Sequence, residues 1–419
     1  MELRSLLHTA KQHGEEASPR LIIADWLEER GDPGDRERAE FIRLQIELCH
    51  AESPGSTKPN RQRKQQRCDE LLRAHRQDWL GPFSKLGNKG NIKFERGLLH
   101  LELPLASMTG RAGQTLLEGE AVWWIDRLLV RISGINPLNL AMESPLLPHV
   151  GTLVLPSASL GVDAVRLLGE KEALVNLSGL DLNYNHVGNA GVGVLGQCPH
   201  LSNLRSLDLW INRIGATGIA SMAKSPHLRH LTHLNLGGNS LRGSGTEALC
   251  KSPITAPLRT LLLWGNNIGQ TGARALSRSR MPHLESLYLN ENRLDHRCME
   301  HLASWPQLRK LKTLSLWRNK LESTGVKILA SQPLPHLSTL LINENRLDDD
   351  ALRSIASQPG FAGLRKLDLH GNPMITESGM RSLIESPYLS REMELIASES
   401  DFCPSVFDLL SSRFALRTI

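Results

Sequence analysis

Three carboxylates near the start of the chain are spaced so that they could act together in metal binding or catalysis. They belong to Asp25, Glu28 and Glu29. If this segment is helical, the spacing i, i+3, i+4 places all three on one face. Such a face could hold a metal ion or transfer protons. Nearby arginines such as Arg30 and Arg43 can pair with these carboxylates, so the competing interpretation is a solvated, ion-paired helix surface. We favour the second interpretation.

A second cluster is basic and could contact phosphate. It has no acidic residue between its first and last members, which are Lys58, Arg61, Arg63, Lys64 and Arg67. Lysine and arginine at this density can neutralise the phosphates of a nucleic acid. No aromatic residue interleaves the run, however, so a solvated loop and helix face is the alternative.

Motifs for catalysis or metal binding are otherwise missing from the sequence. There is no P-loop, no G-x-S-x-G, no H-E-x-x-H and no credible Ser-His-Asp set. Five histidines each follow a proline and lie roughly one or two repeats apart, too far for a shared metal: His149, His200, His227, His283 and His336. We therefore expect no enzyme activity, no cofactor and no metal site, and we interpret these histidines as part of a recurring turn.

Tryptophan recurs at a long, regular interval, and the interval is twice that of a shorter repeat. Trp210, Trp264 and Trp317 lie 54 and 53 residues apart. The shorter repeat has the pattern L-x-x-L-x-L-x-x-N-x-L, in which Leu also varies to Ile, Val or Met. Its first position falls at Leu177, Leu204, Leu231, Leu258, Leu284, Leu311, Leu337 and Leu364. A period of 26 or 27 residues with this consensus predicts a solenoid of stacked repeats.

Each position of the pattern has a physical reason. The leucines alternate along a short strand and face inward. The asparagine sits where the chain turns away from the strand, and its amide can bond the free backbone groups of that turn and of the next copy. A stacked ladder is therefore expected from Asn185, Asn212, Asn239, Asn266, Asn292, Asn319, Asn345 and Asn372.

A helix is expected in the second half of each copy. Its start is marked by a hydroxyl residue followed directly by glycine, which suits a helix N-cap region, at Thr217, Ser244, Thr271, Thr324 and Ser378. The run Asp348-Asp349-Asp350 sits at the same place in its copy, and N-capping explains it too. Helices pack roughly 10 Å apart, whereas parallel strands lie about 4.8 Å apart. The stack must therefore curve, with its strands on the concave side.

This pattern resembles the leucine-rich repeat proteins, and the helices and long period resemble their ribonuclease-inhibitor subclass. The resemblance implies an α/β fold, a curved solenoid with parallel strands inside and helices outside. Three degenerate copies, beginning at Leu98, Ile125 and Val150, precede the eight regular ones and lack the asparagine. About 11 repeats are therefore expected over residues 94–387.

Residues 1–93 do not repeat and are expected to form a small all-helical domain, with helices from Leu3, over 18–30, from 35 to 50 and over 61–76. The Pro/Gly/Ser-rich residues 51–60 are expected to be a loop. The stretch from Ala24 to Asp32, the stretch from Arg38 to Gln45, and the later Trp79-Leu80-Gly81-Pro82 resemble the repeat-companion domain of planctomycete bacteria. That resemblance covers about residues 3–103. It implies a bacterial, planctomycete origin and carries no activity that could be transferred to residues.

After residue 387 the repeat pattern ends. Residues 388–419 are too apolar for a free tail, and we expect a helical cap over the last repeat.

The net charge, the cysteine content and the lack of long apolar runs allow few further conclusions. Net charge is +5, a weak excess that does not by itself predict nucleic-acid binding. The six cysteines have no paired spacing, which favours free thiols in a reducing cytoplasm. We find no secretion signal and no apolar run that approaches the length of a membrane span, so a cytoplasmic location without a membrane partner is expected.

We interpret the chain as a non-catalytic protein-protein interaction module, a scaffold that binds a protein partner on its concave face. The residues expected there are Tyr184, Asp208, Trp210, Trp264, Tyr288, Asn290, Trp317, Arg318, Asn343 and His370. Because the tryptophans lie two copies apart, adjacent rings are expected roughly 10 Å from each other and out of stacking contact. The alternatives are a nucleic-acid-associated protein that uses the basic 58–76 region, and a scaffold or regulatory subunit for an enzyme in bacterial signalling or defence.

Overall fold

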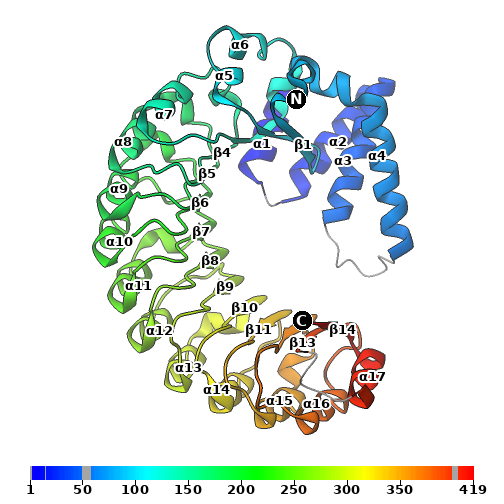
Figure 1. Cartoon of the computed structure of the whole chain (residues 1–419), viewed down its shortest axis with the longest axis vertical. Coiled ribbons are helices and arrows are strands. Elements are labelled where there is room, and N and C mark those ends of the chain that lie inside the picture. The colour runs from blue at the N-terminus through cyan, green and yellow to red at the C-terminus, as the bar shows by residue number, and fades with distance from the viewer. Residues whose placement is uncertain (1, 15, 50–57, 399–403) are drawn as a thin grey trace. The chain divides into compact units, whose positions relative to one another are not determined.

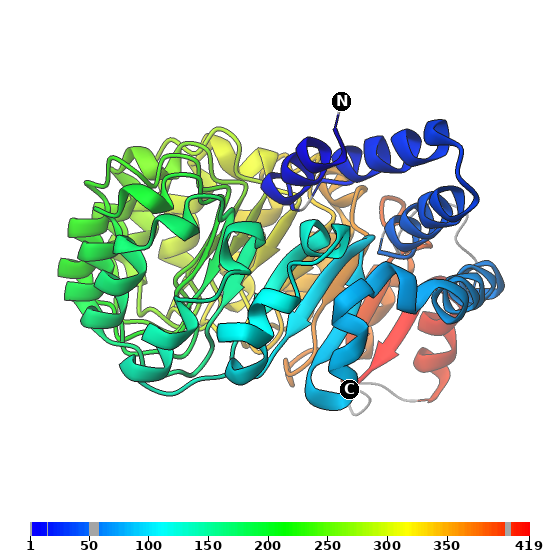
Figure 2. The ribbon, with the colours of Figure 1, turned by 90° about the horizontal axis from the view of Figure 1, so that it is seen from above.

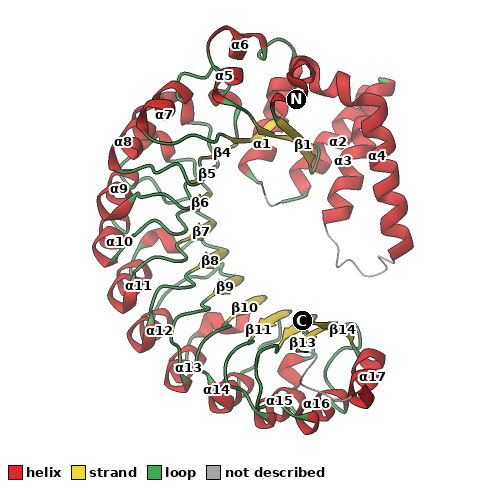
Figure 3. Cartoon of the chain, viewed as in Figure 1, coloured by secondary structure: helices red, strands yellow, loops and turns green. Residues whose placement is uncertain are grey.

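The computed structural model describes residues 2–14, 16–49, 58–398 and 404–419. The chain divides into two compact units, each considered by itself. The first comprises residues 1–185 with 198–207, and the second comprises residues 186–197 with 208–419. Both contain short strands alternating with helices, and in the first unit a group of consecutive helices precedes them (Figures 1, 2 and 3). Among the described residues, no helix is both long and apolar enough to span a lipid bilayer.

The first unit begins with four helices and a 3-10 segment: α1 (Leu3–Gln12), α2 (Ser18–Arg30), α3 (Pro33–Cys49), α4 (Lys58–Leu80) and η1 (Gly81–Lys89). Pro19 occupies the first turn of α2, where its missing N–H costs nothing, and Gly31 ends the helix with φ of 84°. The helix α4 is longer than expected. Most of the loop predicted for residues 51–60 falls outside the described residues, and its last part already belongs to α4.

A β-hairpin follows these helices, and it corrects the expectation that every strand is parallel and that residues up to 93 are helical. Strand β1 (Asn91–Glu95) pairs antiparallel with β2 (Leu98–Glu102). The two turn residues, Arg96 and Gly97, both have positive φ, as a two-residue hairpin turn requires. Gly97 also lies against α3, where an added Cβ would be 2.4 Å from Ile42 Cγ1.

The degenerate repeats and the strand of the first regular repeat, β5 (Gly179–Asp181), complete the first unit. From β2 onward the strands pair in parallel, through β3 (Ile125–Leu129), β4 (Thr152–Val154) and β5. The segments between them are short helices and 3-10 turns: α5 (Leu105–Met108), α6 (Gly110–Thr115), η2 (Glu120–Trp124), α7 (Ile135–Ala141), η3 (Leu147–His149), α8 (Val162–Glu170) and η4 (Glu172–Leu174). The turn η5 (Pro199–Leu201) also belongs to this unit. The irregular lengths of these elements reflect the departures from the consensus in this part of the sequence.

The remaining regular strands belong to the second unit, apart from β6 (Ser206–Asp208), which lies at the boundary between the units. They are β7 (His233–Asn235), β8 (Thr260–Leu262), β9 (Ser286–Tyr288), β10 (Thr313–Ser315), β11 (Thr339–Leu341) and β12 (Lys366–Asp368). Their register follows the consensus, since Leu314 pairs with Leu287 on one side and with Leu340 on the other. These leucines are fully buried and form a continuous core between strands and helices.

One helix follows each regular strand. The helices are α9 (Gly188–Leu195), α10 (Ala216–Met222), α11 (Arg242–Cys250), α12 (Gly269–Ser277), α13 (His296–Ala303), α14 (Glu322–Ala330), α15 (Asp349–Ala356) and α16 (Glu377–Ile384). Within the second unit these helices line the outer side of an arc and the strands line its inner side (Figures 1 and 3). Because helices are wider than the strand spacing, the helical side is the longer one.

The starts of these helices differ in detail from the sequence expectation. Thr217 lies inside the first turn of α10, and the N-cap residue is Gly215. The glycine after each hydroxyl residue serves close packing instead, because a Cβ at Gly218 would lie 2.6 Å from Asn189 Oδ1 in the preceding helix. Asp348 is the N-cap of α15, and its carboxylate accepts a hydrogen bond from the backbone N–H of Asp350.

The C-terminal segment is only partly helical, which corrects the expected helical cap. Strands β13 (Glu394–Ala397) and β14 (Ala415–Thr418) flank α17 (Pro404–Arg413) and extend the parallel sheet beyond β12. Leu395 pairs with Leu367 and takes its inward position, whereas Ile396 pairs with Asp368. The segment therefore continues the stack with a sequence that no longer matches the consensus.

Candidate functional site

The three recurring tryptophans lie at equivalent turns, two residues beyond the ends of β6, β8 and β10. Each is half-buried. The next residue in each copy has positive φ, with values of 48° at Ile211, 65° at Gly265 and 54° at Arg318. The backbone thus turns sharply at the same place in each copy. Each tryptophan side chain is therefore attached at an equivalent position on the concave side, which the strands line.

Trp210 and Trp264 contact each other, contrary to the expectation of separate rings. Their ring centroids are 5.5 Å apart and the ring planes make an angle of 60°. The intervening copy carries Gly237 and Gly238, and an added Cβ at Gly237 would lie 2.2 Å from Trp264 Nε1. A Cβ at Gly238 would lie 3.3 Å from Trp210 Nε1. The expectation of 10 Å was wrong because it used the strand spacing alone, whereas two long indoles can lean over a pair of glycines.

Charged side chains lie close to Trp317. The Arg318 guanidinium carbon lies 5.9 Å from the Trp317 ring centroid, within cation–π range. Arg318 also pairs with Glu344 at 3.2 Å and lies 3.9 Å from Glu291. Residues at the same turn position of three consecutive copies therefore form an acid–base–acid row beside an aromatic ring.

Two asparagines expected on the contact surface are buried beneath it. Asn290 and Asn343 are only 4% and 5% exposed. Asn290 Oδ1 accepts a hydrogen bond from Ser315 Oγ at 3.1 Å, and Asn343 Nδ2 lies 3.3 Å from His370 Nε2. These amides face neighbouring copies because each must satisfy its polar atoms once the strands stack, so they position the surface rather than contribute to it.

The other expected contact residues differ in their accessibility. Asp208 accepts hydrogen bonds from the backbone N–H of Trp210 and from Asn235 Nδ2, each at 2.9 Å, and so fixes the turn that carries the first tryptophan. Tyr288 is half-buried, and burial raises the pKa of its hydroxyl. His370 Nδ1 lies 2.7 Å from Asp368 Oδ1. Tyr184 is 55% exposed with φ of 56° and belongs to the first unit, so it is considered apart from the tryptophans.

The consensus asparagines are buried and bridge successive copies. The eight side chains are at most 6% exposed. In the middle of the stack, Asn266 Nδ2 donates to the carbonyl oxygens of Leu236 at 2.8 Å and Leu263 at 3.0 Å, and its Oδ1 accepts from Leu241 N at 3.2 Å. Its own N–H donates to Asn292 Oδ1 at 2.9 Å. Each amide therefore holds its own turn and the turn of the preceding copy.

The basic run on α4 is partly neutralised. Lys64 pairs with Glu47 at 2.7 Å, and Arg67 makes two hydrogen bonds to the Glu40 carboxylate at 2.8 and 2.9 Å. Arg61 and Arg63 are exposed, and the side chain of Lys58 lies outside the described residues.

The acidic face of α2 is paired in the same way. Arg43 bonds both Asp25 and Glu28 at 2.7 Å, and Glu29 is exposed. Both charged clusters identified from the sequence thus use part of their charge on neighbouring helices of the first unit.

No group of three or more His, Cys, Asp or Glu side chains among the described residues could hold a metal ion. Burial raises the pKa of Cys68 to about 11 and those of Cys250 and Cys298 to about 12. Thiols with such values remain protonated near neutral pH and are poor nucleophiles.

Sequence reasoning missed the glycine pair that brings the tryptophans together. Gly237 stands where every other regular copy carries Asn, Trp or His, and this difference was the available signal. The position of Gly238 is also glycine in two other copies, at Gly265 and Gly371. Small residues directly between two aromatic positions indicate that something occupies the space above them.

Residues 227–250 match a family model described as a leucine-rich repeat. This match spans about one copy of the repeat. No match was found among the curated proteins compared. Among solved structures, the chain is similar to an internalin from Listeria monocytogenes, with 20% identity, a TM-score of 0.41 and coverage of 69% of this chain and 70% of that chain. It is also similar to a chain in the structure of the Rad7 and Elc1 complex in yeast, with 14% identity, a TM-score of 0.47 and coverage of 95% of both chains.

Proposed function

We propose that the concave leucine-rich repeat face of the second unit binds a protein partner. The observation that carries this proposal is the contact between Trp210 and Trp264 over Gly237 and Gly238. Two half-buried indoles in contact form a rigid apolar anchor with polar N–H groups. Tryptophan, tyrosine and arginine are the residues enriched at the energetic centres of protein interfaces.

Charged residues beside the anchor would orient the partner. Arg318 lies between Glu291 and Glu344, and it is 59% exposed as a side chain. Exposed ion pairs of this kind contribute little to stability, but they discriminate between partners by charge. We therefore propose a partner surface with an apolar or aromatic protrusion next to charged groups.

The test begins with identification of the partner. Affinity capture with the full chain from its native host, read by mass spectrometry, gives candidates, and binding is then measured with purified proteins. Truncation of a central interface tryptophan removes about 2 kcal/mol or more, roughly a thirty-fold change in affinity. Trp264→Ala should weaken binding by about this factor with little change in melting temperature. Trp26→Ala in α2 of the first unit is the matched control and should bind normally.

The outcome that contradicts the proposal is equally specific. If Trp264→Ala binds normally while charge reversal of Arg63 and Lys64 abolishes binding, α4 is the contact site instead. Nucleic-acid binding through residues 58–76 remains the alternative, and Arg61 and Arg63 keep their exposure there. A mobility-shift assay over a salt series separates it, because phosphate contacts weaken steeply as salt rises.

A scaffold role for an enzyme in signalling or defence, a cytoplasmic location, and the planctomycete and ribonuclease-inhibitor resemblances stay predictions from the sequence. Captured partners that include an enzyme would favour the scaffold role.

A further inference from the structure

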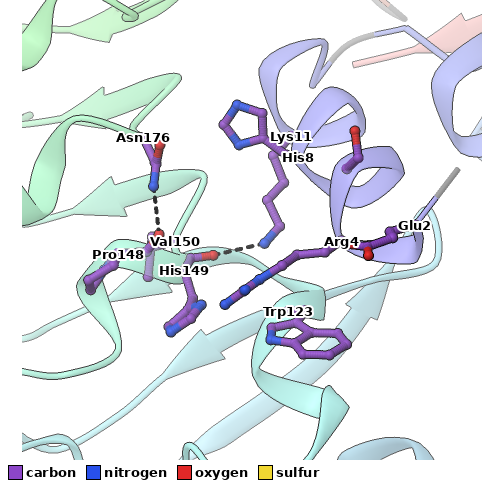
Figure 4. A pocket seen from close by; sticks show the side chains of 10 residues that line it. Glu2, Arg4, His8, Lys11, Trp123, Pro148, His149, Val150 and Asn176 are labelled. Carbon is purple, nitrogen blue, oxygen red and sulfur yellow. Dashed lines mark hydrogen bonds between the residues drawn. The ribbon is translucent and has the colours of Figure 1, made fainter.

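A cationic pocket lies in the first unit, between α1 and the turns that precede β3, β4 and β5 (Figure 4). Its volume is about 460 Å³. The residues that give it chemical character are Arg4, His8 and Lys11 from α1, Trp123 from η2, His149 from η3, and Asn176. The tryptophans of the proposed partner surface belong to the second unit, so this pocket stands on separate observations.

Lys11 is the buried member of the pocket. It is only 8% exposed, and its ammonium donates a hydrogen bond to the carbonyl oxygen of His149 at 2.8 Å. Burial lowers the pKa of this amine to about 8, while the charge of Asp126 acts in the opposite direction. An ammonium group carries three N–H donors, and the His149 carbonyl uses one of them.

Arg4 brings a second cation from about two helical turns away on α1. Its guanidinium carbon lies 5.3 Å from the centroid of the Trp123 ring, so the indole face holds it in place. Figure 4 shows the head groups of Arg4 and Lys11 directed to the same side of the pocket, where the His149 ring also lies. Three nitrogen-bearing groups from two segments far apart in sequence thus meet at one place.

The local charge balance is positive. Burial lowers the pKa of His149, and the nearby charges of Lys11 and Arg4 lower it further. The acidic residues nearby are Glu2 at the edge of the pocket and Asp126 beside Lys11. Asp126 is already shared, since Arg20 lies 3.6 Å and His100 3.5 Å from its carboxylate. An anion placed between Arg4 and Lys11 would therefore reduce the repulsion between these two positively charged side chains.

We propose that this pocket binds a phosphate monoester, carried either by a small molecule or by a phosphorylated side chain. A guanidinium, an ammonium and an imidazole that approach from different directions suit an anion with several acceptor oxygens around one centre. The volume exceeds that of one phosphate group, so the organic part of the ester would lie against Trp123 and Pro148.

Calorimetric titration of the full chain tests the proposal with three probes: inorganic phosphate, O-phosphoserine and adenosine monophosphate. At least one should bind with a dissociation constant below about 1 mM. Tighter binding of phosphoserine indicates a phosphorylated side chain as the source, and tighter binding of the nucleotide indicates a small molecule. If none of the three binds, the proposal is wrong.

Substitution of Arg4 locates the site without disturbing the core, because this side chain is exposed. Arg4→Gln should weaken binding of the tightest probe by about tenfold or more, since it removes a charge-assisted contact. Arg111→Gln, an exposed arginine of α6 outside the pocket, is the matched control and should bind as the unchanged protein does. Equal weakening by both substitutions would show only a general effect of charge and would overturn the proposal.

A titration of His149 gives a readout that does not depend on affinity. The charged groups that face this ring are Lys11 and Arg4, with His8 and Glu2 also lining the pocket. A bound phosphate dianion stabilises the imidazolium form, so the pKa of His149 should rise when the probe saturates the protein. The resonance is assigned by its loss in His149→Gln and followed by NMR. An unchanged pKa of His149 at saturating probe would place the anion elsewhere and overturn the assignment.

Discussion

At the residue scale, Asn266 shows how one amide holds two repeats together. Its side chain bonds carbonyl oxygens of its own turn and of the preceding copy, and it accepts a backbone N–H from that copy. The side chain is fully buried, so water cannot replace these bonds. The stability of the stack at this point therefore depends on a polar residue surrounded by leucines.

We predict that Asn266→Ala lowers the free energy of unfolding clearly. Each buried backbone group that loses its partner costs roughly 1–3 kcal/mol. The melting temperature should fall well below that of Lys327→Ala, an exposed control on α14. Equal melting temperatures for the two variants would reject the structural role of the ladder.

A second prediction at this scale concerns Gly237. Addition of a methyl group there brings a Cβ to 2.2 Å from Trp264 Nε1, so the indole must move away from Trp210. The near-ultraviolet circular dichroism of Gly237→Ala should therefore change toward that of Trp264→Phe, while the melting temperature changes little. Gly243→Ala on α11 places its Cβ against Thr271 rather than an indole and serves as the control. An aromatic spectrum identical to that of the unchanged protein would mean that the two rings do not depend on the glycine gap.

At the element scale, the helices are positioned by links between their first turns. Asp348 caps α15 through the N–H of Asp350, and it also accepts a hydrogen bond from Ser323 Oγ at the start of α14. The hydrogen bond from Ser323 is the largest cause of the lowered pKa of this carboxyl group. Thr376 at the start of α16 bonds Asp349 in the same manner. Because adjacent helices are joined in this way, a change at one cap affects two elements.

We predict a pH-dependent cost for Asp348→Ala. At pH 7 the loss of the cap should lower the free energy of unfolding by about 1 kcal/mol. The pKa of Asp348 is lower in the folded protein than in the unfolded chain, so the contribution of its charge is complete above about pH 4. That contribution is lost as the pH falls through the folded pKa, and the difference from the unchanged protein should narrow at about pH 2.

Urea unfolding of the two proteins at several pH values checks this prediction. Glu300→Ala, an exposed acidic residue of α13, is the control and should change the free energy of unfolding little at any pH. A difference between Asp348→Ala and the unchanged protein that stays constant down to pH 2 would show that the carboxylate charge contributes nothing.

At the scale of the whole molecule, stability is distributed because the repeats have no common centre. Each copy packs on its two neighbours, as Leu314 does on Leu287 and Leu340. The stability of such a stack is approximately a sum of the repeats and the interfaces between neighbours. A local defect should therefore loosen the nearest copies first.

Hydrogen exchange of Asn266→Ala tests this distribution. Amides of α11, in the preceding copy, and of α12, in the copy that contains Asn266, should exchange faster than in the unchanged protein. Amides of α2 and α3 in the first unit should keep their protection. A uniform increase over both units would indicate one cooperative structure instead.

Much of the fold is predictable from the sequence because the same local environment recurs in every repeat. The leucine register and the asparagine turns follow from the consensus, and strands β7 to β12 occur where L-x-L predicts them. The sequence also predicted the role of single residues that act locally, such as Gly31 at the end of α2 and Asp348 at the start of α15. These features depend on neighbours in sequence or on copies of the same pattern.

Other features were decided only by the tertiary structure, because they depend on contacts between residues far apart in the chain. Strand β13 joins the sheet although its sequence has left the consensus, since its apolar residues Leu395 and Ile396 are buried at the open end of the core, and β14 then pairs with β13. Trp210 meets Trp264 only because two glycines in the copy between them leave space. Lys11 donates a hydrogen bond to the carbonyl oxygen of His149, and the two residues are 138 positions apart in the sequence, so no local pattern encodes this contact. The sequence by itself therefore determined the repeating scaffold, whereas packing between distant side chains decided which of its surfaces could bind a ligand.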